Sequence, residues 1–232
     1  MKIRLTISIL MLAFAQVANA NLIRNASFED IPGTIIGQGI MPSEWVIANV
    51  TPDTYSNDGS YGLAPSAGSG GGNFTGVTAQ DGIRWVAGWS SANEYFGQTL
   101  SAPLVGGQSY SFSSYLIQAK RSDLDHPGGY GVYLSSGSTD IGGELLGNIG
   151  PTTDSNDWEF SSFTFIAPTN SSILPFLLFK PFGDVTGEAY PGLDNLNLTA
   201  TSIGAVPLPA AFWLFGTALL GFVGTLSRRK IR

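Results

Sequence analysis

The central part of the chain, residues 21–202, lacks any long amphipathic helical pattern and shows many short strand-like runs. In residues 109–119, Tyr110, Phe112 and Leu116 share one parity with serines between them, which is typical of a half-buried strand. Turns such as "VGGQ" at 105–108 and "HPGG" at 126–129 separate the runs. This pattern predicts an all-β fold, an antiparallel β-sandwich of the jelly-roll type.

The predicted strands are rich in β-branched and aromatic residues and are bounded by turn residues. We expect strands over residues 45–50, 82–89, 95–100, 109–119, 129–134, 158–167, 173–182 and 193–201. The Gly- and Ser-rich residues 66–76 are interpreted as a surface loop, because strand patterns continue on both sides. Residues 21–202 therefore form one predicted domain of ordinary size.

The first 20 residues have the features of a secretory signal peptide. A positively charged start precedes the apolar stretch Leu5–Ala15, and Ala18-Asn19-Ala20 supplies the small residues of a cleavage site. An uncleaved anchor is the alternative, but the apolar stretch is short for that role. We expect cleavage after Ala20, so that the bulk of the protein is exported.

The C-terminal end carries an uncharged apolar segment followed directly by a basic cluster. Residues 210–226 would form a helix of roughly 26 Å, near the lower limit for crossing a bilayer. Residues 228–232 carry four cations, which the positive-inside rule places in the cytoplasm. A buried core helix does not account for these cations. We therefore predict a single transmembrane helix over 210–226 that tethers the exported domain to the inner membrane.

Residues 203–232 also resemble the bacterial PEP-CTERM sorting signals, in the variant with a VPLPA motif. The motif (206–210), an apolar helix and a basic cluster occur in the order that this family shows. The predicted sorting residues are Val206, Pro207, Leu208, Pro209, Ala210, Arg228, Arg229 and Lys230. The resemblance implies processing by an exosortase-type membrane protease, in a Gram-negative bacterium that makes exopolysaccharide or biofilm. The alternative is a tail that only anchors the protein.

The charge of the exported part differs strongly from that of the whole chain. All 17 acidic residues of the sequence lie between Glu29 and Asp194, whereas residues 21–202 carry five Lys or Arg, giving a net charge of about −12. Such a surface repels nucleic acid and anionic lipid and attracts divalent cations. The sequence contains no cysteine, so disulfides and thiol chemistry are excluded.

A second resemblance spans the predicted domain. The segments "NLIRNASFED" (21–30) and "GLDNLNLTA" (192–200) resemble the first and last strands of jelly-roll domains with the galactose-binding-like fold, common among carbohydrate-binding modules. The segment "YFGQTLSAPLVGGQSYSFSSYL" (95–116) resembles a hairpin of the same domains. The resemblance implies an extracellular domain that binds carbohydrate.

Asp194 and Glu29 are the candidate metal ligands. Asp194 shares its parity with two leucines of its strand, and a lone buried carboxylate is costly unless it is paired or metal-bound. The family resemblance offers Glu29 as its companion in a structural Ca²⁺ site. The alternatives are that both carboxylates are solvated at strand ends, or that they pair with Arg24 or a backbone amide.

Enzymatic residues are scarce in this sequence. One histidine and no cysteine remove most nucleophilic and zinc mechanisms. The acids at 123, 125, 154, 157 and 159 lie in polar, turn-like surroundings, where no feature of the sequence would raise a pKa. We therefore predict that the chain is not an enzyme.

Binding of sugars is the favoured function. Trp85, Trp89 and Tyr95 are the candidate ligand-binding residues, since Trp85 and Trp89 share a face if their segment is a regular strand. The alternative is that these aromatic residues lie in the core of the sandwich. The sequence predicts a cell-surface or extracellular protein that associates with polysaccharide; a structural envelope or matrix protein without a glycan ligand is the other possibility.

Overall fold

The computed structural model describes residues 20–67, 72–154, 156–184 and 187–201. Within these ranges the chain forms ten strands and one short 3-10 helix. The elements are β1 (Val46–Asn49), β2 (Asp53–Ser56), β3 (Arg84–Ala87), β4 (Tyr95–Thr99), β5 (Ser109–Ile117), β6 (Gly128–Ser135), β7 (Glu144–Ile149), β8 (Glu159–Ile166), η1 (Ser171–Ile173), β9 (Phe176–Gly183) and β10 (Gly192–Ala200).

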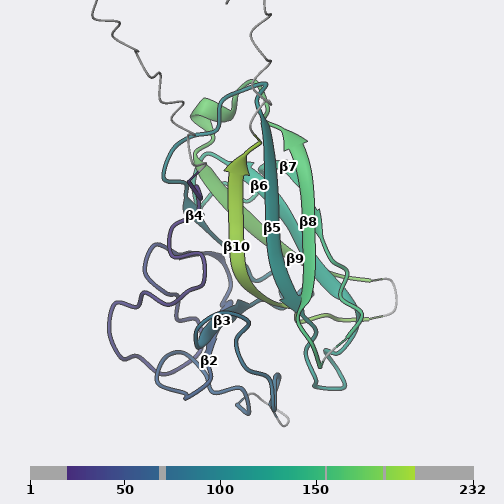
Figure 1. The fold of residues 1–232 in the computed structure, drawn as a ribbon. Coiled ribbons are helices and arrows are strands. Elements are labelled where there is room, and N and C mark those ends of the chain that lie inside the picture. The colour runs from purple at the N-terminus through teal and green to yellow at the C-terminus, as the bar shows by residue number, and fades with distance from the viewer. Residues whose placement is uncertain (1–19, 68–71, 155, 185–186, 202–232) are drawn as a thin grey trace, which may run out of the picture.

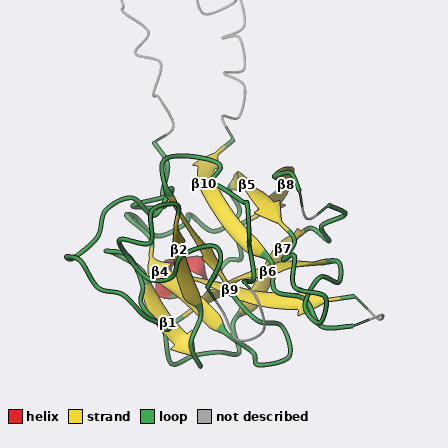
Figure 2. Cartoon of the chain, turned by 90° about the horizontal axis from the view of Figure 1, so that it is seen from below, coloured by secondary structure: helices red, strands yellow, loops and turns green. Residues whose placement is uncertain are grey.

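The strands form two five-stranded sheets, visible in Figures 1 and 2. We call them the β9 sheet, with the order β1-β4-β9-β6-β7, and the β10 sheet, with the order β2-β3-β10-β5-β8. Neighbouring strands are antiparallel throughout both sheets. From β3 onward the chain crosses repeatedly between the two sheets. The predicted antiparallel β-sandwich is confirmed.

Each of the eight predicted strands has a counterpart, but two observed strands were missed. β2 is buried at all four positions and therefore shows no alternation. β7 reads "ELLGNI", with three of its six residues exposed and a central glycine. Residues 21–30, which resemble the first strand of the jelly-roll domains, instead form a series of bends and turns in which Phe28 has a φ of 62°. Local turn geometry prevents this segment from joining a sheet as a regular strand.

The main core lies between the two sheets and is rich in aromatic side chains. Phe112 of β5 and Phe179 of β9 meet across it, with their ring centroids 5.9 Å apart. Trp45 packs on Phe179 from the loop before β1, at 5.8 Å. Burial of each such side chain contributes about 1.5–3 kcal/mol. The alternation predicted for residues 109–119 is confirmed, because every second position of β5 is buried.

A second apolar cluster covers the other face of β2 and β3. Tyr55 and Trp85 stack with centroids 5.4 Å apart, and Phe74 meets the Trp85 ring edge-on at 5.9 Å. Phe74 comes from the long connection between β2 and β3, which gathers beside these strands in Figure 1. Because loops cover this part of the β10 sheet, β2 and β3 are buried on both faces.

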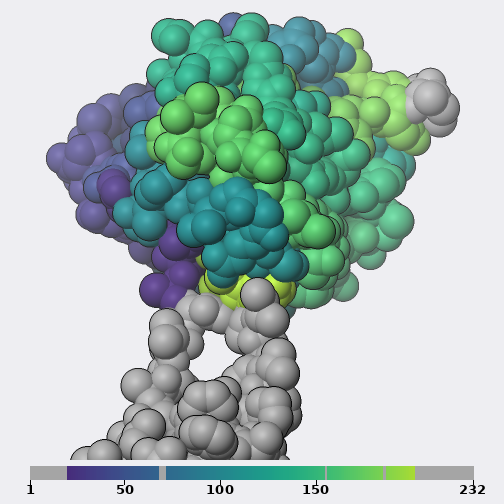
Figure 3. Space-filling model, turned by 90° about the horizontal axis from the view of Figure 1, so that it is seen from above, coloured from purple at the N-terminus to yellow at the C-terminus, as the bar shows by residue number. Residues whose placement is uncertain are grey.

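Both ends of the described chain lie at one end of the sandwich. The Leu22 amide donates to the Leu198 carbonyl at 2.9 Å, and the Asn21 side chain bonds to Leu196 and Leu198. Figure 3 shows the N-terminal residues (purple) close to the last described residues (yellow-green). The opposite end of the sandwich is therefore free to present its loops.

Candidate functional site

Strand register brings several loops together at the end of the sandwich opposite the chain termini. Asp53 pairs with Ala87, Ala87 pairs with Gly192, and Gly192 pairs with Ile117, so these four residues form a row across the β10 sheet. The loop after β3, the loop after β5 and the segment before β10 all continue from this row. They meet around a pocket.

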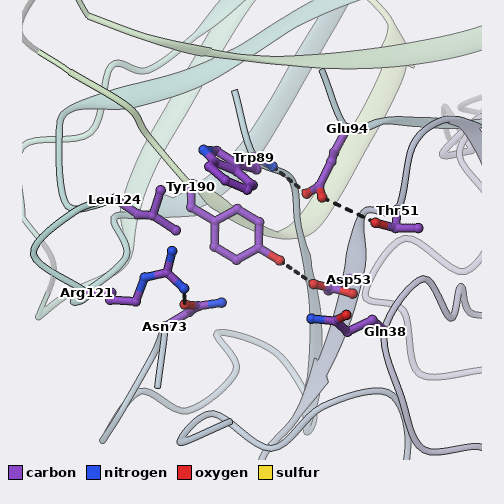
Figure 4. Close-up of a pocket in the computed structure, with 9 residues that line it drawn as sticks. All are labelled: Gln38, Thr51, Asp53, Asn73, Trp89, Glu94, Arg121, Leu124 and Tyr190. Atoms are coloured by element: carbon purple, nitrogen blue, oxygen red, sulfur yellow. Dashed lines mark hydrogen bonds between the residues drawn. The ribbon is translucent and has the colours of Figure 1, made fainter. Parts of the chain in front are cut away.

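The pocket has a volume of about 220 Å³ and a largely polar lining (Figure 4). Trp89 and Tyr190 form its aromatic wall, while carboxylate, amide and hydroxyl groups face them. Its lining residues are Gln38, Thr51, Asp53, Asn73, Trp89, Glu94, Arg121, Leu124 and Tyr190.

Asp53 and Glu94 are two buried carboxylates in this pocket, each only 6% exposed. Asp53 accepts hydrogen bonds from the Gly39 amide at 2.8 Å and the Tyr190 hydroxyl at 2.7 Å. Glu94 accepts from the Trp89 amide at 2.7 Å. Burial raises the pKa of Asp53, and burial together with the charge of Asp53 raises the pKa of Glu94 to about 7.

A hydrogen-bonded network extends from Asp53 beneath the pocket. Asn73 donates to the Tyr55 hydroxyl at 2.7 Å, and the Tyr55 and Tyr190 hydroxyls are 3.5 Å apart. Burial raises the pKa of both tyrosines, so they stay protonated and act as donors. Arg121 donates to the Asn73 side chain at 3.1 Å. This network fixes the positions of the pocket's polar groups.

Two buried carboxylates with raised pKa values can accept hydrogen bonds, hold a cation or exchange a proton. The sequence analysis did not identify either of them, since Asp53 begins a strand without alternation and Glu94 lies in the turn-like "SSANEY". Their burial is produced by loops that meet only after the sheet forms.

A second concavity lies on the outer face of the β9 sheet. Tyr95 on β4 and Tyr133 on β6 are half-buried there, on either side of Lys180 on β9. The Lys180 amino group lies 4.0 Å from the Tyr133 ring centroid and 5.5 Å from that of Tyr95. It also donates to the carbonyl oxygens of Ile141 and Gly142.

We call this concavity the tyrosine groove. It has a volume of about 400 Å³, and its residues come from β4, β6, β7 and β9. They are Tyr95, Gly131, Tyr133, Leu145, Asn148, Lys180, Pro181 and Phe182. The exposed amide of Asn148 supplies a donor and an acceptor beside the aromatic rings.

The three predicted ligand-binding aromatics separate in space. Trp85 is fully buried in the second apolar cluster, so it cannot form a surface platform. Trp89 lies beyond the end of β3 and lines the pocket, where its indole donates to Glu188 at 2.9 Å. Tyr95 lines the tyrosine groove. The shared face expected for Trp85 and Trp89 is therefore wrong, because the strand ends at Ala87.

Glu29 and Asp194 both bind the segment 80–84. Asp194 is fully buried and accepts from the amides of Gln80, Asp81 and Asn195 at 2.7–3.0 Å. Burial raises the pKa of Asp194 to about 8, against the opposing effect of these amides.

Glu29 accepts from the amides of Ile83 and Arg84 at 2.8 Å and from the Arg84 guanidinium at 2.9 Å. Both Glu29 and Asp194 therefore pair with backbone amides, which was one of the alternatives to a metal site. Across the described ranges, no three His, Cys, Asp or Glu residues are grouped to hold a metal ion. Calcium at Glu29 and Asp194 stays a prediction.

The predicted export and sorting segments fall mostly outside the described residues. This applies to the signal peptide apart from Ala20, to the VPLPA motif at 206–210 and to the basic tail at 228–232. Among the residues that are described, no helix combines the length and apolar character needed to span a bilayer. The predicted transmembrane helix, 210–226, is not among them.

Comparisons with known proteins find similarity in structure alone. No family model and no curated protein matches the chain. The solved structures similar to it include a Stig cyclase, Fisc from Fischerella sp. TAU, in complex with an indole compound. It is 20% identical, with a TM-score of 0.48, over 78% of this chain and 96% of that one.

Carbohydrate-binding modules are also among these structures. TmCBM61, in complex with β-1,4-galactotriose, is 14% identical with a TM-score of 0.42, over 78% of this chain and 99% of that one. A family 16 module is 16% identical with a TM-score of 0.36, over 53% of this chain and 80% of that one. At such low sequence identities and TM-scores, these structures do not indicate the function of this chain, which must be inferred from its own side chains.

The prediction that the chain is not an enzyme is corrected here. Cyclases, which are enzymes, are among the similar structures. Of the acidic residues, that prediction weighed those at 123, 125, 154, 157 and 159, in turn-like, polar surroundings. It overlooked Asp53 and Glu94, whose burial raises their pKa values.

Proposed function

We propose that the chain is an exported, C-terminally sorted protein whose sandwich binds extracellular polysaccharide in the tyrosine groove. The observation that carries this proposal is the pair of half-buried tyrosine rings, Tyr95 and Tyr133, on one outer sheet face with polar groups between and beside them. Ligand sites commonly combine aromatic surface with a few well-placed polar groups. A sugar ring offers apolar C–H faces to the former and hydroxyl groups to the latter.

The groove is held in place by the sheet. Its two tyrosines and Lys180 lie on the neighbouring strands β4, β9 and β6, whose register is continuous across the groove. Sites built on strands keep their geometry better than sites on loops. Gly131 lies directly across from Lys180 and leaves room beside it, since a Cβ there would overlap the Tyr133 ring.

Charge limits the class of polysaccharide. Residues 21–202 carry 17 acidic side chains and five Lys or Arg, so a polyanion is repelled by the protein as a whole. Lys180 is the cation of the groove, and it already donates to two carbonyl oxygens. Neutral polymers and polymers carrying amino groups are therefore the expected ligands.

Export and sorting form the second part of the proposal. The signal peptide would release the domain outside the cytoplasm, and residues 203–232 would hold it at the inner membrane until an exosortase-type enzyme removes the tail. Support for a tether at this end comes from the hydrogen bond between Leu22 and Leu198, which holds the last described residues beside the first ones. Mass spectrometry of the mature C-terminus from native cells tests this, and an intact Arg232 would show that the tail only anchors the protein.

Affinity electrophoresis of the mature protein in gels containing neutral polysaccharides tests the groove. We expect Tyr133→Ala to weaken retention by about tenfold, equivalent to about 1.4 kcal/mol. Phe160→Ala is the matched control, because this aromatic residue is 61% exposed on the outer face of the other sheet. Retention that is unchanged in Tyr133→Ala, or equally weakened in the control, would refute the groove. No retention by any polymer would favour a matrix protein without a glycan ligand.

A further inference from the structure

The pocket at the loop end of the sandwich is separate from the tyrosine groove. The two share no lining residue, and consecutive residues, Glu94 and Tyr95, line the pocket and the groove respectively. The pocket therefore offers a second place where a ligand can be recognised. Its chemistry differs from that of the groove, since buried carboxylates take the place of half-buried tyrosines.

The charge of the pocket favours a cation. Asp53 and Glu94 are both buried in it. Arg121 is the cation among the described residues that line the pocket, and its guanidinium is paired with Asp123 through two contacts of 2.5 and 2.9 Å. Because Asp123 already balances the charge of Arg121, the carboxylates of Asp53 and Glu94 can attract a positively charged ligand. An anion would be repelled.

Glu94 has acceptor capacity that the described residues do not fill. Its Oε2 atom accepts from the Trp89 amide at 2.7 Å. Its Oε1 atom has, within the described chain, only a 3.5 Å contact with the Thr51 hydroxyl, at the outer limit for a hydrogen bond. Figure 4 shows this carboxylate between Trp89 and Thr51. An ammonium group bound there would donate to Oε1 and relieve the repulsion between the two carboxylates.

Several ionisable groups face Glu94 and set its protonation. Burial is the main cause that raises its pKa, and the negative charge of Asp53 raises it further. Tyr55, Tyr130 and Tyr190 lie close enough to feel the charge of Glu94, and all three have raised pKa values, so they stay neutral. A bound ammonium group would favour the charged carboxylate and release its proton.

Size and lining narrow the class of ligand. A volume of about 220 Å³ is below the roughly 300–1,000 Å³ of pockets that take drug-sized molecules, so one small ring is the largest occupant expected. The rings of Trp89 and Tyr190 form an aromatic wall for the body of such a ring and for a cation. Gln38, Thr51 and Asn73 supply groups for hydroxyls.

We infer that this pocket binds the protonated amine of an amino sugar, so that the protein recognises de-N-acetylated hexosamine residues of a polysaccharide. That the amino sugar belongs to a polysaccharide rests on the proposed function. That the pocket recognises the amine of one sugar residue rests on Asp53 and Glu94. An N-acetylated residue lacks the positive charge, and its acetyl group adds bulk to a ring that already fills the pocket.

Isothermal titration of the mature protein at pH 6.5 with glucosamine, N-acetylglucosamine and glucose tests this inference. We expect glucosamine to bind at least tenfold more tightly than the other two sugars. In Glu94→Gln this preference should fall by at least tenfold, while the melting temperature shows that the variant is folded. Ethanolamine, which has the amine without the ring, should bind more weakly than glucosamine.

Each contrary result overturns the inference. Equal affinity for glucosamine and glucose, binding of none of the sugars, or an unchanged preference in Glu94→Gln would show that the pocket does not select an amine. Ethanolamine binding as tightly as glucosamine would remove the sugar from the assignment. The groove variant Tyr133→Ala should bind glucosamine as the wild type does. A wrong assignment of the groove is therefore distinguished from a wrong assignment of the pocket.

Discussion

The pH dependence of stability provides a quantitative test of the buried carboxylate Glu94. Burial is the largest cause that raises its pKa from 4.5 to about 7, and the charge of Asp53 adds to it. The folded protein therefore binds this proton more tightly than the unfolded chain does. The contribution of Glu94 to the free energy of unfolding is fully present below pH 4.5 and is lost as pH rises towards 7.

The size of the effect follows from the same pKa change. A rise from 4.5 to about 7 corresponds to about 3 kcal/mol, at about 1.36 kcal/mol per pKa unit. Solvent reaches the pocket at the exposed residue Thr51, and we reduce the value to about 2 kcal/mol for this screening. About 1 kcal/mol shifts the melting temperature of a domain of this size by about 2–4 °C, so Glu94 accounts for about 4–8 °C.

Thermal unfolding of the wild type and Glu94→Gln, followed by circular dichroism between pH 4.5 and 8, measures this contribution. Asp53 and Asp194 also have raised pKa values and destabilise the wild type in the same direction, but they are present in both proteins. The variant should match the wild type at pH 4.5 and melt about 4–8 °C above it at pH 8. The exposed-acid control Glu144→Gln should follow the wild type. Parallel profiles for the wild type and Glu94→Gln would refute the reasoning.

Three further predictions concern stability. Arg84→Met leaves the half-buried Glu29 carboxylate without its guanidinium partner and should lower the free energy of unfolding by about 1–3 kcal/mol, measured by urea denaturation; no change would show that the backbone amides suffice. Gly97→Ala places a Cβ against the Leu177 carbonyl of the neighbouring strand and should destabilise by at least about 1–3 kcal/mol in the same assay, whereas wild-type stability would contradict the close strand approach. Removal of calcium with EDTA should lower the melting temperature if Glu29 and Asp194 hold Ca²⁺, and an unchanged value would count against that site.

The strands with regular alternation could be predicted from the sequence. Residues 109–113 alternate between serine and aromatic side chains, and β5 (Ser109–Ile117) is buried at every second position from Tyr110 to Leu116. β2 could not be predicted in this way, because the loop that carries Phe74 covers its outer face and removes the alternation. In residues 21–30 the positive φ of Phe28 turns the chain, although the residue pattern resembles a strand.

The candidate site was predicted less well than the fold. Tyr95 and Trp89 line a groove and a pocket, but they lie in different places because β3 ends before Trp89. Asp194 is buried as its parity with Leu196 indicates. Glu94 was missed because its burial depends on loops that are far apart in the sequence and meet through the register of the β10 sheet.

Hydroxyl-radical footprinting of the mature protein with a partly de-N-acetylated oligosaccharide is the most direct test of the two binding sites. Side chains that the ligand covers become protected from oxidation, and mass spectrometry locates them. We expect protection of Tyr95 and Tyr133 in the groove and of Trp89 in the pocket, with Phe160 on the opposite sheet face unchanged. Protection at Phe160 instead, or at none of these residues, would contradict polysaccharide binding by this chain as proposed.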